Sequence, residues 1–238
     1  MQPLIITLDG PAGSGKSTVA QELARRLGLE FLNTGDMYRG ITAQCLDDAI
    51  DPRTSPQAVE DFARDCNIRF DWKADPPKLY VNNRDVTARL RDGDVERSVS
   101  IVAAITGVRR VLVREQQKIG REHPRLVTEG RDQGSIVFPG AQMKFFITAS
   151  AQVRARRRAE QLRTKGRDAD ERIILQQITE RDQRDSSHGE GLIRPNDAID
   201  IDTSEMNLPQ VLDLLEKAVH RRIDRGAVAG TQASGAAR

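Results

Sequence analysis

The sequence of 238 residues is poor in cysteine, in aromatic residues and in long apolar runs. Its two cysteines, Cys45 and Cys66, lack the spacing of a metal site, so we expect free thiols in a reducing compartment, which indicates the cytoplasm. No apolar run approaches the roughly 20 residues of a membrane span. We expect no cleaved signal peptide, because a glycine-rich loop already begins at Gly10. Membrane and secreted classes are therefore disfavoured.

A strong net charge is also missing. The formal net charge of +2 provides no general attraction to nucleic acid or to an anionic membrane, and we expect neither as a partner. What the sequence does contain is arginine, which makes up 30 of the 37 basic residues. Guanidinium groups bind phosphate oxygens in pairs, but a GC-rich genome would also favour arginine over lysine. The number of arginines alone is therefore consistent with either phosphate binding or a GC-rich genome.

Short apolar runs alternate with helical patterns along most of the chain. Strands are predicted over residues 3–8, 30–32, 126–130, 144–148 and 198–202. Between the first two, Ala20, Leu23, Ala24 and Leu27 recur at helical spacing, and Gly28 follows as a C-terminal cap. This alternation predicts an α/β fold with a parallel five-stranded sheet and helices on both faces.

Two segments depart from that rhythm. Residues 67–94 alternate apolar and polar positions around PP and NN turns, which predicts a small antiparallel β insert. The tail over 226–238 is rich in small and polar residues, and we expect it to be disordered. The remaining chain forms one domain, with its core over 1–66 and 95–225.

The segment GPAGSGKST fits the phosphate-binding pattern G-x-x-x-x-G-K-[ST], with a strand before it and a helix after it. Glycines allow successive backbone N–H groups to face phosphate oxygens, and the helix N-terminus adds its dipole. Lysine reaches the β- and γ-phosphates, and the serine hydroxyl ligates Mg²⁺. We therefore predict that ATP is bound by Gly10, Pro11, Ala12, Gly13, Ser14, Gly15, Lys16, Ser17 and Thr18, with Ser17 as the metal ligand.

Other phosphate-loop proteins fit less well. GTPases read guanine through an N-K-x-D element, which this sequence lacks. Motor and AAA-type ATPases require long coupling modules, for which little chain remains. A compact phosphotransferase with its own acceptor site is the interpretation that remains.

Three further stretches indicate which acceptor. They are TGDMYRG (34–40), EGRDQGSIVFPGA (129–141) and the arginine-rich segments 154–167 and 172–185. Together with the phosphate loop, they occur in an order that resembles the bacterial cytidylate kinase family, up to about residue 220. The resemblance implies a nucleoside monophosphate kinase fold and transfer of phosphate from ATP, with Mg²⁺, to CMP and dCMP. It also implies that 67–94 binds the monophosphate and that about 150–168 forms a lid.

The resemblance assigns acceptor contacts as well. Arg39 and Arg131 would hold the acceptor phosphate, and Asp132 would accept a hydrogen bond from the cytosine amino group. Two of the matched sites have simpler explanations on spacing alone: Arg109 as a surface arginine, and Arg181 with Asp185 as an ordinary i,i+4 ion pair. The full predicted acceptor set is Thr34, Tyr38, Arg39, Ser100, Arg109, Arg131, Asp132, Arg181 and Asp185.

The lid segment is strongly basic, with seven basic residues between Arg154 and Arg167 against one acid. A nucleic-acid patch is disfavoured because aromatic residues for base stacking are missing from it. By resemblance, Arg154 would contact the donor, while Arg157 and Arg158 would act in catalysis with Lys16 and Arg131. No general base is expected, since the acceptor phosphate is already ionised.

Some positions depart from the family pattern. His188 stands where the family usually has arginine, and Arg194 is a possible substitute. Two alternatives also stay open: another small-molecule kinase with UMP, AMP or shikimate as acceptor, and a nucleotide-sensing or nucleic-acid-binding module that hydrolyses ATP. We expect a monomer that binds only small nucleotides.

Overall fold

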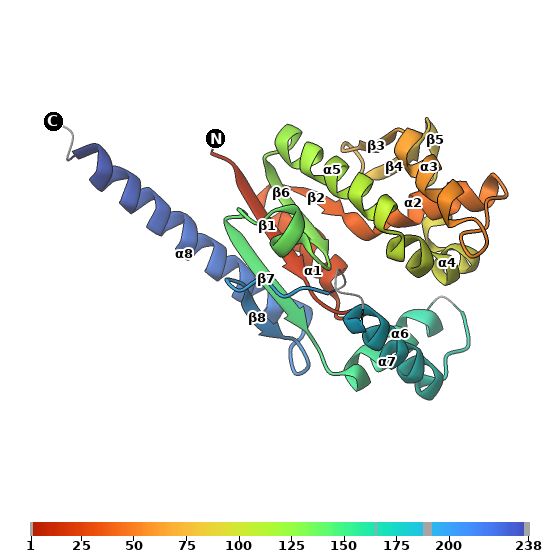
Figure 1. The fold of residues 1–238 in the computed structure, drawn as a ribbon. Helices are drawn as coiled ribbons and strands as arrows, with labels where there is room; N and C mark the ends of the chain where they lie inside the picture. Colours follow the sequence, from red (N-terminus) through yellow and green to blue (C-terminus); the bar gives the residue numbers. More distant parts are fainter. Residues whose placement is uncertain (1, 165, 188–191, 236–238) are drawn as a thin grey trace.

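The computed structural model describes residues 2–164, 166–187 and 192–235. A twisted sheet forms its centre, and helices and a second small sheet surround that centre (Figure 1). In chain order the elements are β1 (Leu4–Asp9), α1 (Lys16–Leu27), β2 (Glu30–Asn33), α2 (Thr34–Asp47), α3 (Pro56–Asp65), β3 (Ile68–Asp71), β4 (Lys78–Val81), β5 (Arg84–Asp85), η1 (Thr87–Arg91), α4 (Gly93–Ala104), α5 (Thr106–Glu122), β6 (Arg125–Gly130), η2 (Gln133–Val137), β7 (Met143–Thr148), α6 (Ala151–Arg163), α7 (Glu171–Ser187), β8 (Ile199–Asp202) and α8 (Leu208–Gly235).

The predicted five-stranded parallel sheet is confirmed. Its strand order is β2-β6-β1-β7-β8, and every neighbouring pair is parallel. In the central pair, Asp9 at the end of β1 lies opposite Gly130 at the end of β6. The phosphate loop after β1 and the loop after β6 therefore leave the sheet side by side at its carboxyl edge, where ligand sites of α/β proteins form.

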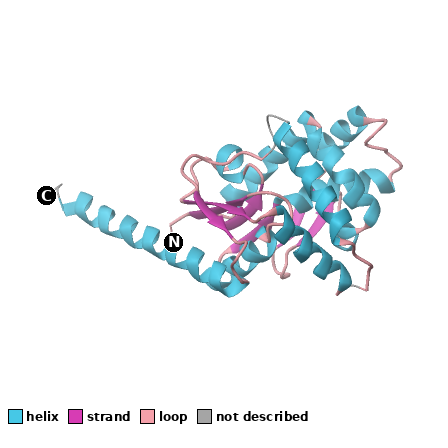
Figure 2. Cartoon of the chain, turned by 90° about the horizontal axis from the view of Figure 1, so that it is seen from below, coloured by secondary structure: helices cyan, strands magenta, loops and turns pink. Residues whose placement is uncertain are grey.

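Helices cover both faces of this sheet, as predicted. On one face, apolar residues of β1, β7 and β8 pack against α1 and α8, with Phe145 and Leu215 fully buried. On the other face, Leu32 and Leu126 pack against residues of α2 and α5. The two views of the molecule show the sheet between these helical layers (Figures 1 and 2).

The antiparallel insert is also confirmed, but it is shorter than predicted. Its order is β3-β4-β5, it ends at Asp85, and the chain is helical again from Thr87. Apolar residues of the insert and of α2 belong to one core. The two elements approach closely at Gly40, where a Cβ would lie only 2.6 Å from Leu79 Cδ2. Gly40 thus allows strand β4 to approach α2 closely, and the insert is part of the same domain.

The segment predicted to form a lid contains helix α6, which pairs with α7 and shares a small core with it. Ala155 and Ala159 of α6 pack against Ile174 and Ile178 of α7. The paired helices therefore extend beyond the predicted lid range of 150–168.

Helix α8 differs from the expectation for the tail. Its backbone is helical to Gly235, past position 226, where the sequence predicts the start of a disordered segment. Several alanines in this stretch, with their high helix propensity, are consistent with the helical backbone. In the described part of the chain, no helix has the length and apolar character of a membrane span. Cys45 and Cys66 are free thiols, as expected.

Candidate active site

The phosphate loop is held in a conformation that requires glycine. Gly10 has φ +148°, and a Cβ there would lie 2.0 Å from the carbonyl oxygen of Ile147 on β7. Gly15 has φ +88° immediately before α1 begins at Lys16. The Lys16 Nζ donates a hydrogen bond to the Pro11 carbonyl oxygen at 2.9 Å, so its side chain folds back over the loop. The loop thus surrounds a cationic amine at a helix N-terminus.

Charged groups from four other parts of the chain surround Lys16. Burial lowers the pKa of Lys16 to about 8, and the nearby Arg131 and Arg181 lower the pKa further, while Glu129 and Asp9 oppose them. These groups come from the β6–η2 loop, α7, β6 and β1. The structure therefore brings together three of the predicted site residues, Lys16, Arg131 and Arg181, whose roles stay predictions.

The loop also contains a buried hydroxyl without a partner. Within the described residues, the Ser14 Oγ is buried and has no hydrogen-bond partner. Buried polar atoms are normally paired, so an unpaired one in a loop of this kind indicates a place for a ligand atom. A phosphate oxygen would accept its hydrogen.

Ser17 lies beside the carboxylate of Glu129, at the end of β6. The Ser17 Oγ donates a hydrogen bond to Glu129 Oε1 at 2.8 Å, and the Thr34 Oγ1 donates to the Glu129 carbonyl oxygen at 2.8 Å. A hydroxyl and a carboxylate are the hard oxygen donors that Mg²⁺ prefers. These two side chains therefore fit a magnesium ion shared with nucleotide phosphates.

Asp9 connects the donor loop to the loop after β6. This fully buried carboxylate accepts hydrogen bonds from the backbone N–H groups of Gln133 and Gly134, both at 2.8 Å. The next residue in the chain is Gly10, and the Arg131 Nη1 lies 3.5 Å from the Gly10 carbonyl oxygen. Burial raises the pKa of Asp9 to about 7, against the lowering effect of the two N–H groups. Asp9 thus fixes the relative position of the two loops.

On the predicted acceptor side, Arg39 of α2 is partly buried and lies near another cation, Arg91. The Arg39 Nη1 lies 3.5 Å from Asp36 Oδ1, and Arg91 of η1 contacts the same oxygen at 2.8 Å. The Arg39 Nε is buried and has no hydrogen-bond partner among the described residues. Burial, reinforced by Arg91, lowers the pKa of Arg39. A partly buried, incompletely paired guanidinium beside a second one is suited to binding a dianion.

Asp132 and Arg109 form a close ion pair in the loop after β6. The Arg109 Nη2 donates to Asp132 Oδ2, and the Gln133 Nε2 donates to Asp132 Oδ1 at 3.3 Å. Burial raises the pKa of Asp132, and Arg109 opposes that rise. Arg109 is therefore paired in the interior rather than being a solvated surface arginine, which was the simpler explanation. Ser100 is partly buried on α4, and Tyr38 is partly buried on α2.

The three lid arginines have different surroundings. Arg154 is buried, its Nη1 donates to the Ala12 carbonyl oxygen at 3.0 Å, and its guanidinium pairs with Asp182 of α7 at 2.6 Å. Arg158 pairs instead with Glu96 of α4. Arg154 therefore lies over the phosphate loop, and Arg158 reaches toward the acceptor side.

Arg157 contacts the turn between β8 and α8. Its guanidinium donates to the Oγ1 and carbonyl oxygen of Thr203, at 3.0 and 2.6 Å. Arg157 is three positions after Arg154, so the two side chains leave the same side of α6. The catalytic role of Arg157 stays a prediction.

Two predicted positions, 185 and 188, lie partly or wholly outside the described residues. The side chain of Asp185 and all of His188 lie outside the described residues, so the proposed pair of Arg181 with Asp185 stays a prediction. Arg194, the candidate substitute for an arginine at 188, pairs with Asp200 Oδ2 at 2.7 Å. That ion pair directs Arg194 to strand β8.

Sequence reasoning missed four carboxylates that surround the predicted site residues. Asp9, Asp36, Glu96 and Asp182 each contact a predicted site residue or the loop that carries it. Asp36 lies inside the quoted segment TGDMYRG and Asp9 directly precedes the phosphate loop, so these positions were an available signal. Glu96 and Asp182 are recognisable only from tertiary contacts.

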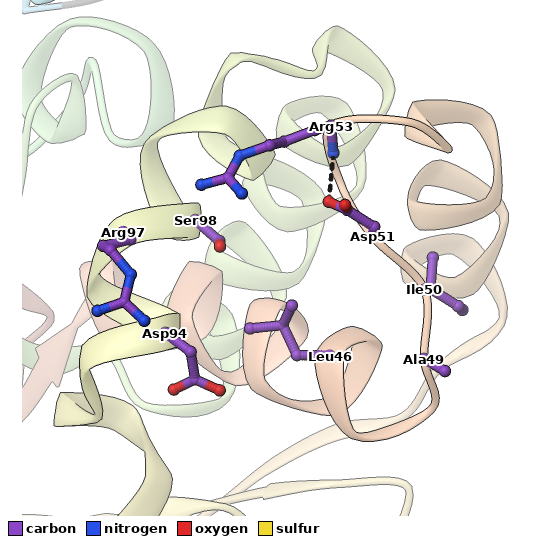
Figure 3. Close-up of a pocket in the computed structure, with 8 residues that line it drawn as sticks. All are labelled: Leu46, Ala49, Ile50, Asp51, Arg53, Asp94, Arg97 and Ser98. Carbon is purple, nitrogen blue, oxygen red and sulfur yellow. Dashed lines mark hydrogen bonds between the residues drawn. The ribbon is translucent and has the colours of Figure 1, made fainter.

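A separate cavity lies beside helix α4. This cavity of about 270 Å³ lies between the end of α2, the turn before α3 and helix α4, and Arg53, Arg97 and Ser98 line part of it (Figure 3). Ser98 and Ser100 are two positions apart on α4 and therefore point to opposite sides of the helix. The cavity contains none of the predicted site residues.

The fold and the site together define a class of protein. A phosphate loop at the carboxyl edge of a parallel sheet, with partly buried arginines on α2 and in the loop after β6, is the arrangement of a P-loop kinase. The family model described as cytidylate kinase matches residues 6–221. The chain belongs to the cytidylate kinase family.

Known proteins agree with this assignment. A cytidylate kinase of Nocardia farcinica (strain IFM 10152) is 37% identical over 226 residues, covering 94% of this chain and 97% of that protein. A cytidylate kinase of Streptococcus thermophilus (strain CNRZ 1066) is 39% identical over 228 residues, covering 95% and 100%. Among solved structures, an uncharacterised protein from Eubacterium ventriosum ATCC 27560 aligns with a TM-score of 0.50 at 14% identity, covering 91% of this chain and 98% of that one. That last likeness concerns the fold alone.

Proposed function

We propose that the protein transfers the γ-phosphate of ATP to CMP and dCMP, producing CDP or dCDP and ADP. The observation that carries the choice of acceptor is the buried Arg109–Asp132 pair, next to the loop that carries Arg131. It provides one acceptor and one donor for the polar edge of a pyrimidine. Membership of the cytidylate kinase family supports the same choice.

The donor side binds the triphosphate of ATP. The N–H groups of the loop and the α1 N-terminus surround the phosphates, and the Lys16 amine neutralises charge on the β- and γ-phosphates. Ser17 and Glu129 would hold Mg²⁺, which supplies charge neutralisation between the β- and γ-oxygens when bound. Arg154, above Ala12, would cover the donor from the lid side.

The acceptor side holds the nucleophile. Arg39 and Arg131 would bind the phosphate of CMP from two sides and direct one of its oxygens toward the γ-phosphate. No side chain has to remove a proton, because a phosphate monoester is already largely dianionic at pH 7, with a second pKa of about 6. Catalysis therefore consists of alignment and charge neutralisation by Lys16 and Arg131, with Arg158 from the lid.

Base selection follows from hydrogen-bond polarity. The cytosine amino group donates to the carboxylate of Asp132, while Arg109 donates to the O2 and N3 edge, with Ser100 assisting. Uracil presents a carbonyl oxygen where cytosine has its amino group, so it would face the carboxylate with like polarity. Buried mismatches of this kind produce discrimination of about 10⁴. Thr34, Tyr38, Arg181 and Asp185 would complete the acceptor site.

An acceptor assay tests this function directly. ATP consumption is measured with CMP, dCMP, UMP, AMP and shikimate, each over a range of concentrations with Mg²⁺ present. We expect the highest kcat/KM with CMP or dCMP. A higher kcat/KM with another acceptor contradicts the base-selection argument. A rate of ATP turnover that does not depend on any acceptor indicates a nucleotide-sensing module.

We also propose that the enzyme acts in the cytoplasm as a monomer. Two free thiols and a reaction that consumes ATP support that compartment. Sedimentation of the purified chain, with and without nucleotides, tests the monomeric state.

A further inference from the structure

An ion pair joins the lid to the acceptor lobe. The Arg158 Nη2, on α6, lies 3.2 Å from Glu96 Oε1 and 3.1 Å from Oε2, so it donates to both carboxylate oxygens. Helix α6 belongs to the lid, whereas α4, which carries Glu96, also carries Ser100. The two ends of this contact are therefore on parts of the molecule that must approach each other when the site closes.

Glu96 also faces the acceptor-phosphate cluster. Its negative charge is close enough to Arg39 to raise the pKa of that guanidinium, against the stronger lowering effect of burial. The carboxylate thus lies between an arginine of the acceptor lobe and an arginine of the lid. A phosphate dianion arriving there would offer both arginines more charge and more acceptor oxygens than the carboxylate does.

The exposure of the pair makes it reversible. The side chains of Arg158 and Glu96 are 38% and 32% exposed, so water competes for both charges. Ion pairs of this exposure contribute little to stability, with a median effect of about 0–1 kcal/mol. Such a pair can bias the position of the lid without locking it.

We propose that Glu96 is a positioning residue that docks the lid onto the acceptor lobe by holding Arg158. This inference rests on the proposed kinase function. Docking places the lid over the space between the phosphate loop and Arg39, and so limits the access of water to the donor phosphate. Glu96 acts through Arg158 and does not itself contact the reacting atoms.

The test compares Glu96→Gln and Glu96→Lys with a matched control in the full-length protein. The control is Glu171→Gln, because Glu171 pairs with lid Arg163 at 3.3 Å, with exposures of 47% and 52%, but joins only α6 to α7. Two readouts are used: the rate of ATP hydrolysis without acceptor divided by the rate of transfer to CMP, and hydrogen–deuterium exchange of α6 amides in the nucleotide-free protein.

For Glu96→Gln, we expect the hydrolysis-to-transfer ratio to rise about threefold to fivefold, the range that a half-exposed pair can supply. We expect a larger rise for Glu96→Lys, because two cations then repel each other. Exchange of α6 amides should accelerate in both variants. For Glu171→Gln, we expect a ratio within twofold of the wild type and faster exchange only near the α6–α7 turn.

The proposal is overturned if both Glu96 variants keep the wild-type ratio and the wild-type exchange of α6, or if Glu171→Gln changes both readouts equally. Failure of the proposed function would look different, since the wild type itself would then not transfer phosphate to CMP. The exchange measurement needs no acceptor, so it decides the docking role in that case too.

Discussion

The buried carboxylate of Asp9 accepts a hydrogen bond of 2.8 Å from the backbone N–H of Gln133, which follows Asp132 in the chain. This contact ties the end of strand β1, and with it the phosphate loop, to the loop that carries Arg131 and Asp132. Phosphoryl transfer between two bound nucleotides requires their phosphates to be aligned, and small displacements are costly. One buried side chain therefore determines the spacing of the donor and acceptor loops.

The ionisation of Asp9 makes the stability of the protein depend on pH. Burial raises its pKa from 3.8 to about 7, so the folded protein binds a proton that the unfolded chain has lost. Its contribution to the free energy of unfolding is fully present below pH 3.8 and decreases as the pH rises toward 7. We expect the stability difference between wild type and Asp9→Asn to shrink over that interval, as measured by urea unfolding at several pH values.

The informative quantity is the direction in which this stability difference changes with pH. Asparagine does not titrate, and all other titrating groups are shared by the two proteins, so their effects cancel in the difference. A difference that stays nearly constant from pH 4 to pH 7 and falls only below about pH 4 would mean that the two N–H groups hold the Asp9 carboxylate ionised, with a lowered pKa.

Lys16→Ala tests the donor site. The substitution removes the amine that neutralises the β- and γ-phosphates, and the loss of one transition-state donor lowers kcat by at least about 10². We expect the circular dichroism spectrum to stay unchanged, because the loop conformation depends on its glycines and not on the amine. Activity that survives the change would show that the loop is not the donor site.

Most of the fold could be predicted from the sequence because its signals are local. The apolar runs at 3–8 and 144–148 are short and flanked by turns, and the glycines of the phosphate loop require one type of backbone. The extent of the insert was harder to predict, because the short helix η1 follows a strand of only two residues, Arg84–Asp85. The helical backbone of α8 beyond 226 was missed because small residues suit both a helix and an unstructured tail.

The site was predictable only in part, because the partner of a charged side chain depends on distant elements. The phosphate loop, Arg39 and Asp132 lie in recognisable motifs, whereas Arg109 is assigned only by its match to the family, and its pairing with Asp132 is visible only in the structure. In contrast, the direction of Arg157 toward Thr203 depends on how α6 packs beside the β8–α8 turn. The pairing of Arg154 with Asp182 depends in the same way on the pairing of α6 with α7.

The pH dependence of ATP use tests the environment of Lys16. Burial lowers the pKa of this amine to about 8 in the protein without nucleotide, so its charge is lost above that pH. We expect kcat/KM for ATP to fall as the pH rises through about 8. The decrease of kcat should begin at a higher pH than the decrease of kcat/KM, because bound phosphates favour the protonated amine of Lys16.

Lys16→Arg is the matched variant for this profile. A guanidinium stays charged throughout the assay range, so the limb near pH 8 should disappear even where the overall rate is lower. A limb that persists in this variant would belong to another group.

Asp132→Ala tests how the base is selected. Removing the carboxylate removes the acceptor for the cytosine amino group and also the like polarity that repels uracil, so we expect the ratio of kcat/KM for CMP to that for UMP to fall by about 10². KM for ATP should stay within twofold of the wild type, because the donor loop is unchanged. Asp132→Asn is the sharper variant, since its amide can donate to the uracil carbonyl oxygen and should shift preference further toward UMP. Equal losses with both acceptors, in both variants, would show that Asp132 supports the loop and does not read the base.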